Sequence, residues 1–170
     1  SDLGAGLQAG CLGGSCAALA GSRAGKVTMA SMTNMPTLHP AEPRHWHEVP
    51  CAPLPGTVLG HTGKLADGSA TMAETTDAAD SDGSGVFRYL LLRSGSEVRA
   101  YVNRCAHFGV PLAAQQDLLK FQPHVRITCN VHYAHYRWSD GVCTAGDCEG
   151  ESLLSIPLTI DADGAIRIAP

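Results

Sequence analysis

The sequence has no apolar run long enough to cross a membrane. A spanning helix needs roughly 18 or more consecutive apolar residues, and no stretch of the chain approaches that length. Basic residues are also few, since the 12 Lys and Arg residues are scattered and the formal net charge is −4. A protein that neutralises phosphates carries a basic stripe. Neither a membrane span nor a nucleic-acid partner is therefore expected.

No secretory signal peptide is expected either, because the Gly-rich stretch at 7–21 has no basic residues before it. The seven cysteines are an odd number, which disfavours a purely structural disulfide framework and favours a reducing compartment in which thiols bind metal. We expect a cytoplasmic location or a soluble organellar compartment. The cysteines stand at positions 11, 16, 51, 105, 129, 143 and 148.

A chain of 170 residues with 44% hydrophobic content can build one ordinary core. Residues 1–40 are rich in Gly, Ala, Ser, Thr and Met without a helical or strand period, so we predict a flexible or processed tail over 1–45 and one domain over 46–170. Within that domain, residues 66–85 carry five acidic residues, no basic ones and almost nothing large and apolar. They are predicted to be a solvated insertion.

The rest of the domain has the pattern of β-strands. Residues 86–93 and 97–103 flank a Ser-Gly-Ser turn and predict a hairpin, whereas only 113–121 suits a helical turn. The predicted fold is all-β, a small antiparallel sandwich or barrel of short strands. Further strands are predicted at 47–51, 125–129, 134–138, 152–160 and 165–169.

Two stretches at strand ends combine a cysteine with a histidine. "CAHFGVPL" offers Cys105 and His107, and "CNVHYAHYRW" offers Cys129 and His132. A structural zinc ion accepts two Cys and two His, but its usual motif pairs Cys with Cys and His with His. A redox dithiol or a nucleophilic cysteine needs a Cys-x-x-Cys pair or a nearby base, and neither is visible. A two-iron cluster with both Cys on one iron and both His on the other suits the mixed pairs best.

These residues carry a family resemblance. "NRCAHFGVPL" followed by "ITCNVHYAHYRWSDGVC" resembles the Rieske iron–sulfur domain, and the chain from 47 to 170 is most similar to the ferredoxin-type members that serve oxygenases. The resemblance implies a small β domain with two cluster-binding loops. It implies that Cys105 and Cys129 hold the inner iron of a [2Fe–2S] cluster, and that His107 and His132 hold the outer iron near the surface. The implied function is one-electron transfer, without catalysis, between a reductase and an acceptor such as an oxygenase.

The chain departs from the family pattern at several positions. Family members usually have Gly where Tyr133 stands, and the respiratory branch has disulfide-bonded cysteines where Val110 and Val131 stand. In that high-potential branch, the resemblance implies, Ser and Tyr hydroxyls follow the second ligand His by two and four residues. The matching residues here are Ala134 and Tyr136. A cluster with one donor fewer is a better reductant, because such bonds stabilise the reduced state.

Alternatives remain open at this stage. The same four residues could serve a structural or regulatory zinc-binding module, or the domain could be the small subunit of a larger reductase. Cys143 and Cys148 flank "TAGD" and either pair with each other or remain free thiols packed near the cluster loops. For the other histidines, His135 included, we predict structural roles.

Overall fold

Strand β3 (Phe87–Ser94) contributes side chains to both hydrophobic cores of the domain. The computed structural model describes residues 43–76 and 85–170. The residues from Tyr89 to Leu92 are all apolar and all buried, so both faces of the strand are buried over its centre. Tyr89 and Leu91 point into one hydrophobic core, while Leu90 and Leu92 point into another. This division follows from the two-residue period of a strand.

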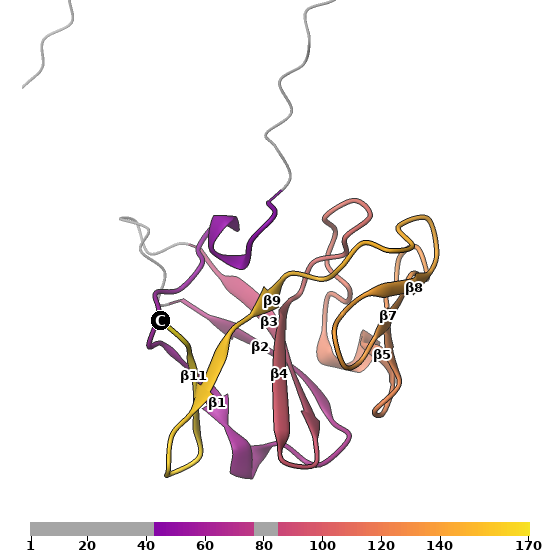
Figure 1. The fold of residues 1–170 in the computed structure, drawn as a ribbon. Helices are drawn as coiled ribbons and strands as arrows, with labels where there is room; N and C mark the ends of the chain where they lie inside the picture. Colours follow the sequence, from indigo (N-terminus) through magenta and orange to yellow (C-terminus); the bar gives the residue numbers. More distant parts are fainter. Residues whose placement is uncertain (1–42, 77–84) are drawn as a thin grey trace, which may run out of the picture. The chain divides into compact units, whose positions relative to one another are not determined.

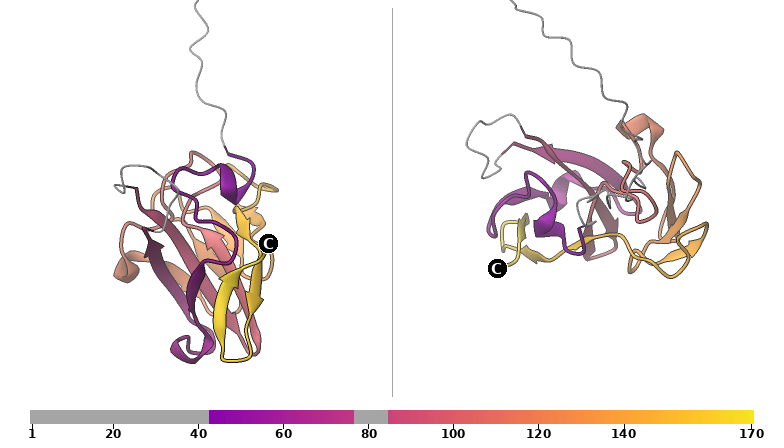
Figure 2. Two further views of the ribbon diagram at one scale, coloured as in Figure 1. Left: turned by 90° about the vertical axis from the view of Figure 1, so that its left-hand side faces the viewer. Right: turned by 90° about the horizontal axis from the view of Figure 1, so that it is seen from above.

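The described strands form three antiparallel sheets, with the orders β1-β11-β10, β2-β3-β4-β9 and β5-β6-β7-β8. Figure 1 shows β5, β7 and β8 on one side of β4, and β1 and β11 on the other. The view from above in Figure 2 shows the same succession. The strands are β1 (Val58–His61), β2 (Ala70–Thr75), β3, β4 (Glu97–Val102), β5 (Lys120–Gln122), β6 (Arg126–Thr128), β7 (His135–Arg137), β8 (Cys143–Ala145), β9 (Ser155–Ile156), β10 (Leu158–Ile160) and β11 (Ala165–Ile168).

The two cores have different contents. One lies among β1, β11 and one face of β3 and β4, and its buried residues are all ordinary scaffold side chains. The other lies between the opposite face of β3 and β4 and the sheet β5-β6-β7-β8. It contains four cysteine side chains together with Tyr136 and Trp138. The chemistry-bearing residues are therefore concentrated in one of the two cores.

The all-β prediction is confirmed, and so is the hairpin of β3 and β4, which are paired from Tyr89↔Val102 to Ser94↔Glu97. The predicted strand 152–160 is interrupted at Pro157, because proline has no N–H to donate. β9 before it pairs with β4, and β10 after it pairs with β11. The chain thus passes from one sheet to another at this proline. The helical turn expected within 113–121 is the 3-10 helix η3 (Gln116–Leu118).

The predicted acidic insertion at 66–85 is wrong for its first half. Residues Ala70–Thr75 form β2, which is paired with β3 along its full length from Ala70↔Leu92 to Thr75↔Phe87. Little apolar surface marks this segment because β2 is an edge strand with mostly half-exposed side chains. Its backbone hydrogen bonds to β3, and not its side chains, make it a strand. Residues 77–84 of the predicted insertion lie outside the described residues.

The predicted strand at 47–51 is also wrong. Residues Trp46–Glu48 form the 3-10 helix η1, because the Glu48 carboxylate accepts hydrogen bonds from the backbone N–H of Arg44 (2.7 Å) and His45 (3.3 Å). These bonds connect Arg44 and His45 to the same short helix. Residues 1–42 of the predicted tail lie outside the described residues. Among those described, no helix is long and apolar enough to cross a membrane.

Two deletions test the role of β2. Removal of 66–76 eliminates six cross-strand residue pairs between β2 and β3. Each backbone hydrogen bond lost with them contributes about 0.5–1.5 kcal/mol to the free energy of unfolding. The total loss approaches the free energy of unfolding of a typical domain, about 5–15 kcal/mol. We expect that variant to show no cooperative thermal transition by circular dichroism. The matched control replaces only 77–84 by Asn-Gly between Thr76 and Gly85, and it should unfold cooperatively. Cooperative unfolding of the first variant would show that β2 is dispensable.

Candidate metal centre

The first cysteine loop begins directly after β4 and closes on itself. The backbone N–H of Cys105 donates to the Val110 carbonyl (2.7 Å), and the Gly109 N–H donates to the Cys105 carbonyl (2.9 Å). The turn requires a left-handed residue, and Gly109 has φ of 66°, a conformation that glycine adopts without a steric penalty. Residues 105–110 thus form a tight loop around the Cys105 thiol, with His107 at its tip.

The second cysteine loop repeats these hydrogen bonds. The Cys129 N–H donates to the Ala134 carbonyl (2.9 Å), and the Tyr133 N–H donates to the Cys129 carbonyl (3.0 Å). Relative to its cysteine, Tyr133 occupies the position of Gly109 in the first loop, and its φ of 58° is left-handed as well. The two loops are therefore the same turn formed twice. The absence of Gly at 133 does not change the backbone of the second loop.

The two loops are joined near their bases. The N–H of Asn130 in the second loop donates to the Leu112 carbonyl that follows the first loop (2.8 Å). Asn103 is buried and secures the same segment, because its side-chain oxygen accepts from the Leu112 N–H (3.0 Å) and its amide donates to the Ala113 carbonyl (2.9 Å). This asparagine was missed by the sequence analysis. A polar residue at the end of an apolar strand is the signal that could have identified it.

Both thiols lie inside the domain. Cys105 and Cys129 are 1% and 0% exposed, and neither forms a disulfide. Burial raises the pKa of Cys129, and the neighbouring Cys105 thiol raises it further. Backbone hydrogen bonds from His132 and Val131 act in the opposite direction and lower that pKa. The second loop therefore supplies N–H donors to the sulfur, which favour the thiolate form that binds metals.

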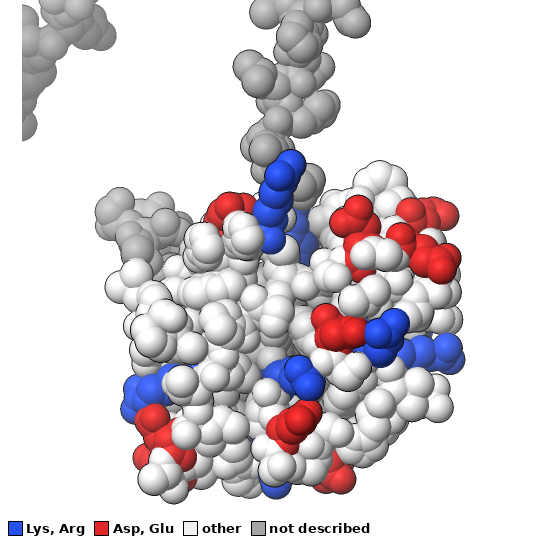
Figure 3. All heavy atoms as spheres, viewed as in Figure 1, with Lys and Arg blue, Asp and Glu red and all other residues white. Residues whose placement is uncertain are grey.

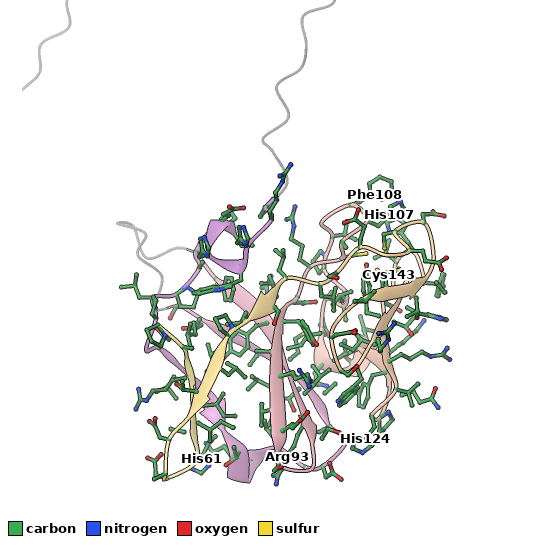
Figure 4. The ribbon with its side chains drawn as sticks, viewed as in Figure 1. His61, Arg93, His107, Phe108, His124 and Cys143 are labelled. Atoms are coloured by element: carbon green, nitrogen blue, oxygen red, sulfur yellow. The ribbon has the colours of Figure 1, made fainter. Side chains whose placement is uncertain are left out.

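The two imidazoles lie beside each other at the surface. The ring centroids of His107 and His132 are 5.1 Å apart and their planes are nearly perpendicular, at 83°. His132 is exposed, whereas the His107 side chain is 17% exposed. His107 Nδ1 is buried and has no hydrogen-bond partner among the described residues. Because buried polar atoms are nearly always paired, this nitrogen is suited to a ligand. Figure 4 shows His107 and Phe108 together at one end of the domain.

The Tyr136 hydroxyl connects the first loop to the third. Its oxygen lies 3.0 Å from Cys105 Sγ and 3.2 Å from Cys148 Sγ, and it accepts a hydrogen bond from the Ala106 N–H (3.0 Å). Burial raises the pKa of Tyr136 far above its ordinary value, and the Cys105 and Cys148 sulfurs raise it further. The hydroxyl therefore stays protonated and can donate its hydrogen to a sulfur. Sequence analysis placed a hydroxyl at this position through the family resemblance.

A third loop, residues 143–151, lies against the other two. Cys143 and Cys148 are free thiols and both are buried, in agreement with the second of the two alternatives considered for them. An added Cβ at Gly146 would lie 3.0 Å from the Cα of Ala134, so the third loop touches the second directly. Asp147 Oδ2 approaches His107 Nε2 at 3.8 Å. The third loop thus lines one side of the site.

The four predicted site residues are brought together as two inner thiols and two outer imidazoles. Within residues 43–76 and 85–170, no group of three or more His, Cys, Asp or Glu side chains is gathered closely enough to hold a single metal ion. A binuclear cluster makes a different demand, since each of its metals takes only two protein ligands. Soft thiolates and neutral imidazoles both suit iron. The donor set therefore fits a two-iron cluster.

The other described histidines make local contacts. His61 Nε2 pairs with the Asp163 carbonyl at 2.6 Å and His124 Nδ1 with the Ser94 hydroxyl at 2.8 Å. Figure 4 places His61 and His124 at the end of the domain opposite to His107. His135 lies on β7, where its Nδ1 is 3.4 Å from a guanidinium nitrogen of Arg126. These contacts agree with the structural roles expected for them.

Comparison with known families identifies the same region. The family model of the Rieske [2Fe-2S] domain matches residues 57–158, a span that contains all three loops. No curated protein matches the chain.

Solved structures with the same fold include both carriers and oxygenases. The ferredoxin of carbazole 1,9a-dioxygenase from Nocardioides aromaticivorans IC177 is 23% identical, with a TM-score of 0.50, over 69% of this chain and 99% of that one. The terminal oxygenase of carbazole 1,9a-dioxygenase from Novosphingobium sp. KA1 is 20% identical, with a TM-score of 0.50, over 69% of this chain but 30% of that one.

A third structure is the reduced complex between oxygenase and ferredoxin in carbazole 1,9a-dioxygenase. It is 21% identical, with a TM-score of 0.50, and the match covers 66% of this chain and 27% of the matched one. The match therefore covers under a third of the chain from the complex and under a third of the terminal oxygenase. It covers nearly the whole of the ferredoxin. At these identities the similarity concerns the fold.

Two glycine substitutions test the turn of the first loop. Gly109 and Gly95 have similar φ values, 66° and 61°, but an added Cβ meets the Arg104 guanidinium at 109 and no atom within 4 Å at 95. We expect Gly95→Ala to cost about 1–2 kcal/mol, the penalty for an L-residue in the left-handed region. Gly109→Ala should cost more, because the Arg104 side chain must also move. Urea unfolding measures both, and equal costs would show that Arg104 does not constrain the loop.

Proposed function

The chain belongs to the Rieske [2Fe-2S] domain family, and from this premise we propose that it is a ferredoxin-type carrier of single electrons. The cofactor of the family is a [2Fe–2S] cluster, which takes up and releases one electron when bound. The observation that carries the proposal is the repeated turn. Two loops with the same backbone hydrogen bonds each offer a buried thiol and an imidazole nearer the surface. A binuclear cluster requires this paired arrangement.

We propose that the protein ligands of the cluster are Cys105, Cys129, His107 and His132. The two buried thiols would hold the inner iron, and the two imidazoles would hold the outer one. Support comes from the buried, unpartnered Nδ1 of His107 and from the perpendicular contact of the two rings. The backbone N–H groups of the second loop lower the pKa of Cys129 against the effect of burial, so they stabilise the charge that a ligand thiolate carries.

The exposed end of this site suits electron transfer to another protein. His132 is exposed, and the apolar side chains of Phe108, Val131 and Tyr133 beside it are exposed as well. Phe108 contacts both imidazoles, with ring centroids 3.7 Å from His107 and 5.2 Å from His132. Apolar and aromatic side chains in the centre of a surface patch are typical of protein contacts. We propose that partners dock on this end of the domain.

Charge beside the docking end favours basic partners. Asp147, Glu149 and Glu151 are exposed on the third loop, and Figure 3 shows acidic atoms gathered over that part of the surface. Complementary charge steers encounters between redox partners. A structure with the same fold is titled as a complex between an oxygenase and a ferredoxin. By analogy we propose that this protein receives electrons from a reductase and passes them to an oxygenase or another acceptor.

The proposed role is that of a carrier and not of an enzyme. Residues after the second loop are used for the strands β7 to β11, which complete the three sheets, and the donor set is accounted for by one cluster. A cytoplasmic or organellar location is supported by Cys105, Cys129, Cys143 and Cys148, which are free thiols. Reduced cysteines are typical of such compartments.

Alanine substitutions test the ligand set. His107→Ala and His132→Ala should each abolish the visible absorption of a [2Fe–2S] protein and lower bound iron well below two atoms per chain, because each removes half of the donors of one iron. His135→Ala is the matched control, since His135 lies on β7, where its ring contacts Arg126. Absorption spectra and iron analysis give the result. Retention of the spectrum in both ligand variants, or a colourless zinc-containing wild-type protein, would contradict the assignment.

Tyr136→Phe tests the hydroxyl at the first thiol. Loss of its hydrogen bond to Cys105 Sγ removes stabilisation of the electron-rich reduced state, so the reduction potential should fall. A bond worth about 0.5–1.5 kcal/mol corresponds to a fall of about 20–65 mV for one electron. Tyr101→Phe is the control, because this buried hydroxyl bonds to the Trp138 carbonyl instead of a sulfur. Protein-film voltammetry compares the two, and equal shifts would contradict a specific role for Tyr136.

A further inference from the structure

Cys143 and Cys148 are not among the proposed cluster ligands, and they contact each other in the third loop. The Sγ atoms of Cys143 and Cys148 are 3.3 Å apart, and both side chains are buried, at 1% and 5% exposure. A disulfide requires about 2.05 Å between its sulfurs. The two sulfurs therefore need to approach by only ~1.3 Å, which a small rotation of the side chains can supply.

The loop holds the two cysteines in this arrangement. The Cys143 N–H donates to the Glu151 carbonyl (2.7 Å), the Gly150 N–H donates to the Cys143 carbonyl (3.0 Å), and the Glu151 N–H donates to the Cys148 carbonyl (3.0 Å). These bonds fix the backbone on both sides of the pair. The ring to be closed contains only the residues from Cys143 to Cys148.

We propose that Cys143 and Cys148 form a reversible intramolecular disulfide, and that this pair is a redox-modification site distinct from the cluster ligands. The formation of the bond does not depend on the proposed function. Its consequence for the reduction potential does rest on that function, because it acts through Tyr136 and Cys105.

A peroxide is the oxidant whose size suits this buried pair. Cys148 is the more exposed thiol and attacks the peroxide oxygen, so that one O–O bond breaks, a Cys148 sulfenic acid forms and water leaves. Burial raises the pKa of Cys143 to about 11, so this thiol keeps its proton until it attacks the sulfenic sulfur. The S–S bond then forms and a second water leaves. In total, the two thiols lose two electrons and two protons to hydrogen peroxide, which becomes two molecules of water.

Oxidation changes what Cys148 offers to Tyr136. As a thiol, Cys148 donates its hydrogen to Cys143 Sγ. The Tyr136 hydroxyl is then the donor in its contacts with Cys148 Sγ at 3.2 Å and Cys105 Sγ at 3.0 Å, and its one hydrogen is shared between the two sulfurs. Disulfide formation changes the Cys148 sulfur that competes with Cys105 for this hydrogen, so the strength of the bond to Cys105 changes. The disulfide form should therefore have a different cluster potential.

Thiol mapping on the intact, cluster-containing protein tests the pairing. The protein is treated with increasing hydrogen peroxide, free thiols are blocked with one alkylating reagent, and a second reagent marks cysteines released by reduction. We expect mass spectrometry to find Cys143 and Cys148 converted together, with loss of two hydrogen atoms per chain, before the visible spectrum declines. Reduction with dithiothreitol should restore both thiols.

Matched variants make this result specific. Cys51→Ser should form the bond as the wild type does, because Cys51 lies outside the third loop. In Cys143→Ser, the Cys148 sulfenic acid has no partner and should be trapped by dimedone. Loss of the spectrum while Cys143 and Cys148 remain thiols would overturn the proposal, as would over-oxidation without linkage or a bond to another cysteine.

Voltammetry tests the consequence separately. The disulfide form should have a different potential from the dithiol form, and this difference should vanish in Tyr136→Phe. An unchanged potential in the wild type would overturn the coupling through Tyr136. Failure of the proposed function would appear differently, as a protein without iron in which the two thiols still pair.

Discussion

The site depends on one backbone constraint, the double hydrogen bond that closes each cysteine loop. In both loops the cysteine N–H donates to the carbonyl five residues later, and the N–H four residues later donates back to the cysteine carbonyl. This turn directs the thiol inward and leaves the following residues at the tip, where His107 and His132 lie. An unpaired buried backbone group costs about 1–3 kcal/mol, so the turn is strongly determined. The separation of inner thiols from outer imidazoles follows from it.

The scaffold explains why the loops can stay in place. β3 is buried on both faces and divides the domain into two cores. One core contains only scaffold side chains, whereas the thiols, Tyr136 and the third loop belong to the other. A change in the charge of the sulfurs therefore acts on the hydrogen bonds of Tyr136 and Cys148, while the opposite core is stabilised mainly by apolar packing. Asn103 supports the first loop separately, because its side chain connects the end of β4 to the segment after that loop.

The sequence predicts the features that depend on local pattern. The apolar run of β3 and the alternation of β4 were sufficient to predict the hairpin, and the mixed Cys-His spacings predicted the ligand set that we propose. β2 could not be predicted, because its pairing with β3 and not its side chains makes it a strand. The strand expected at 47–51 failed because one carboxylate, Glu48, caps a turn instead. Likewise, the contact of Tyr136 with two sulfurs joins residues from separate loops, which no spacing along the chain expresses.

Tyr133 shows how the loop constraint outweighs a residue's own preference. A left-handed conformation costs an L-residue about 1–2 kcal/mol, and a glycine would avoid this cost. The two backbone hydrogen bonds of the turn contribute about 0.5–1.5 kcal/mol each. Lys120 Nζ lies 5.0 Å from the ring centroid of Tyr133, a cation–π contact worth about 0.5–1 kcal/mol at the surface. These contributions together are of the same size as the cost or larger, so the turn tolerates the tyrosine. The result is an exposed aromatic ring beside His132, at the end of the domain on which we propose that partners dock.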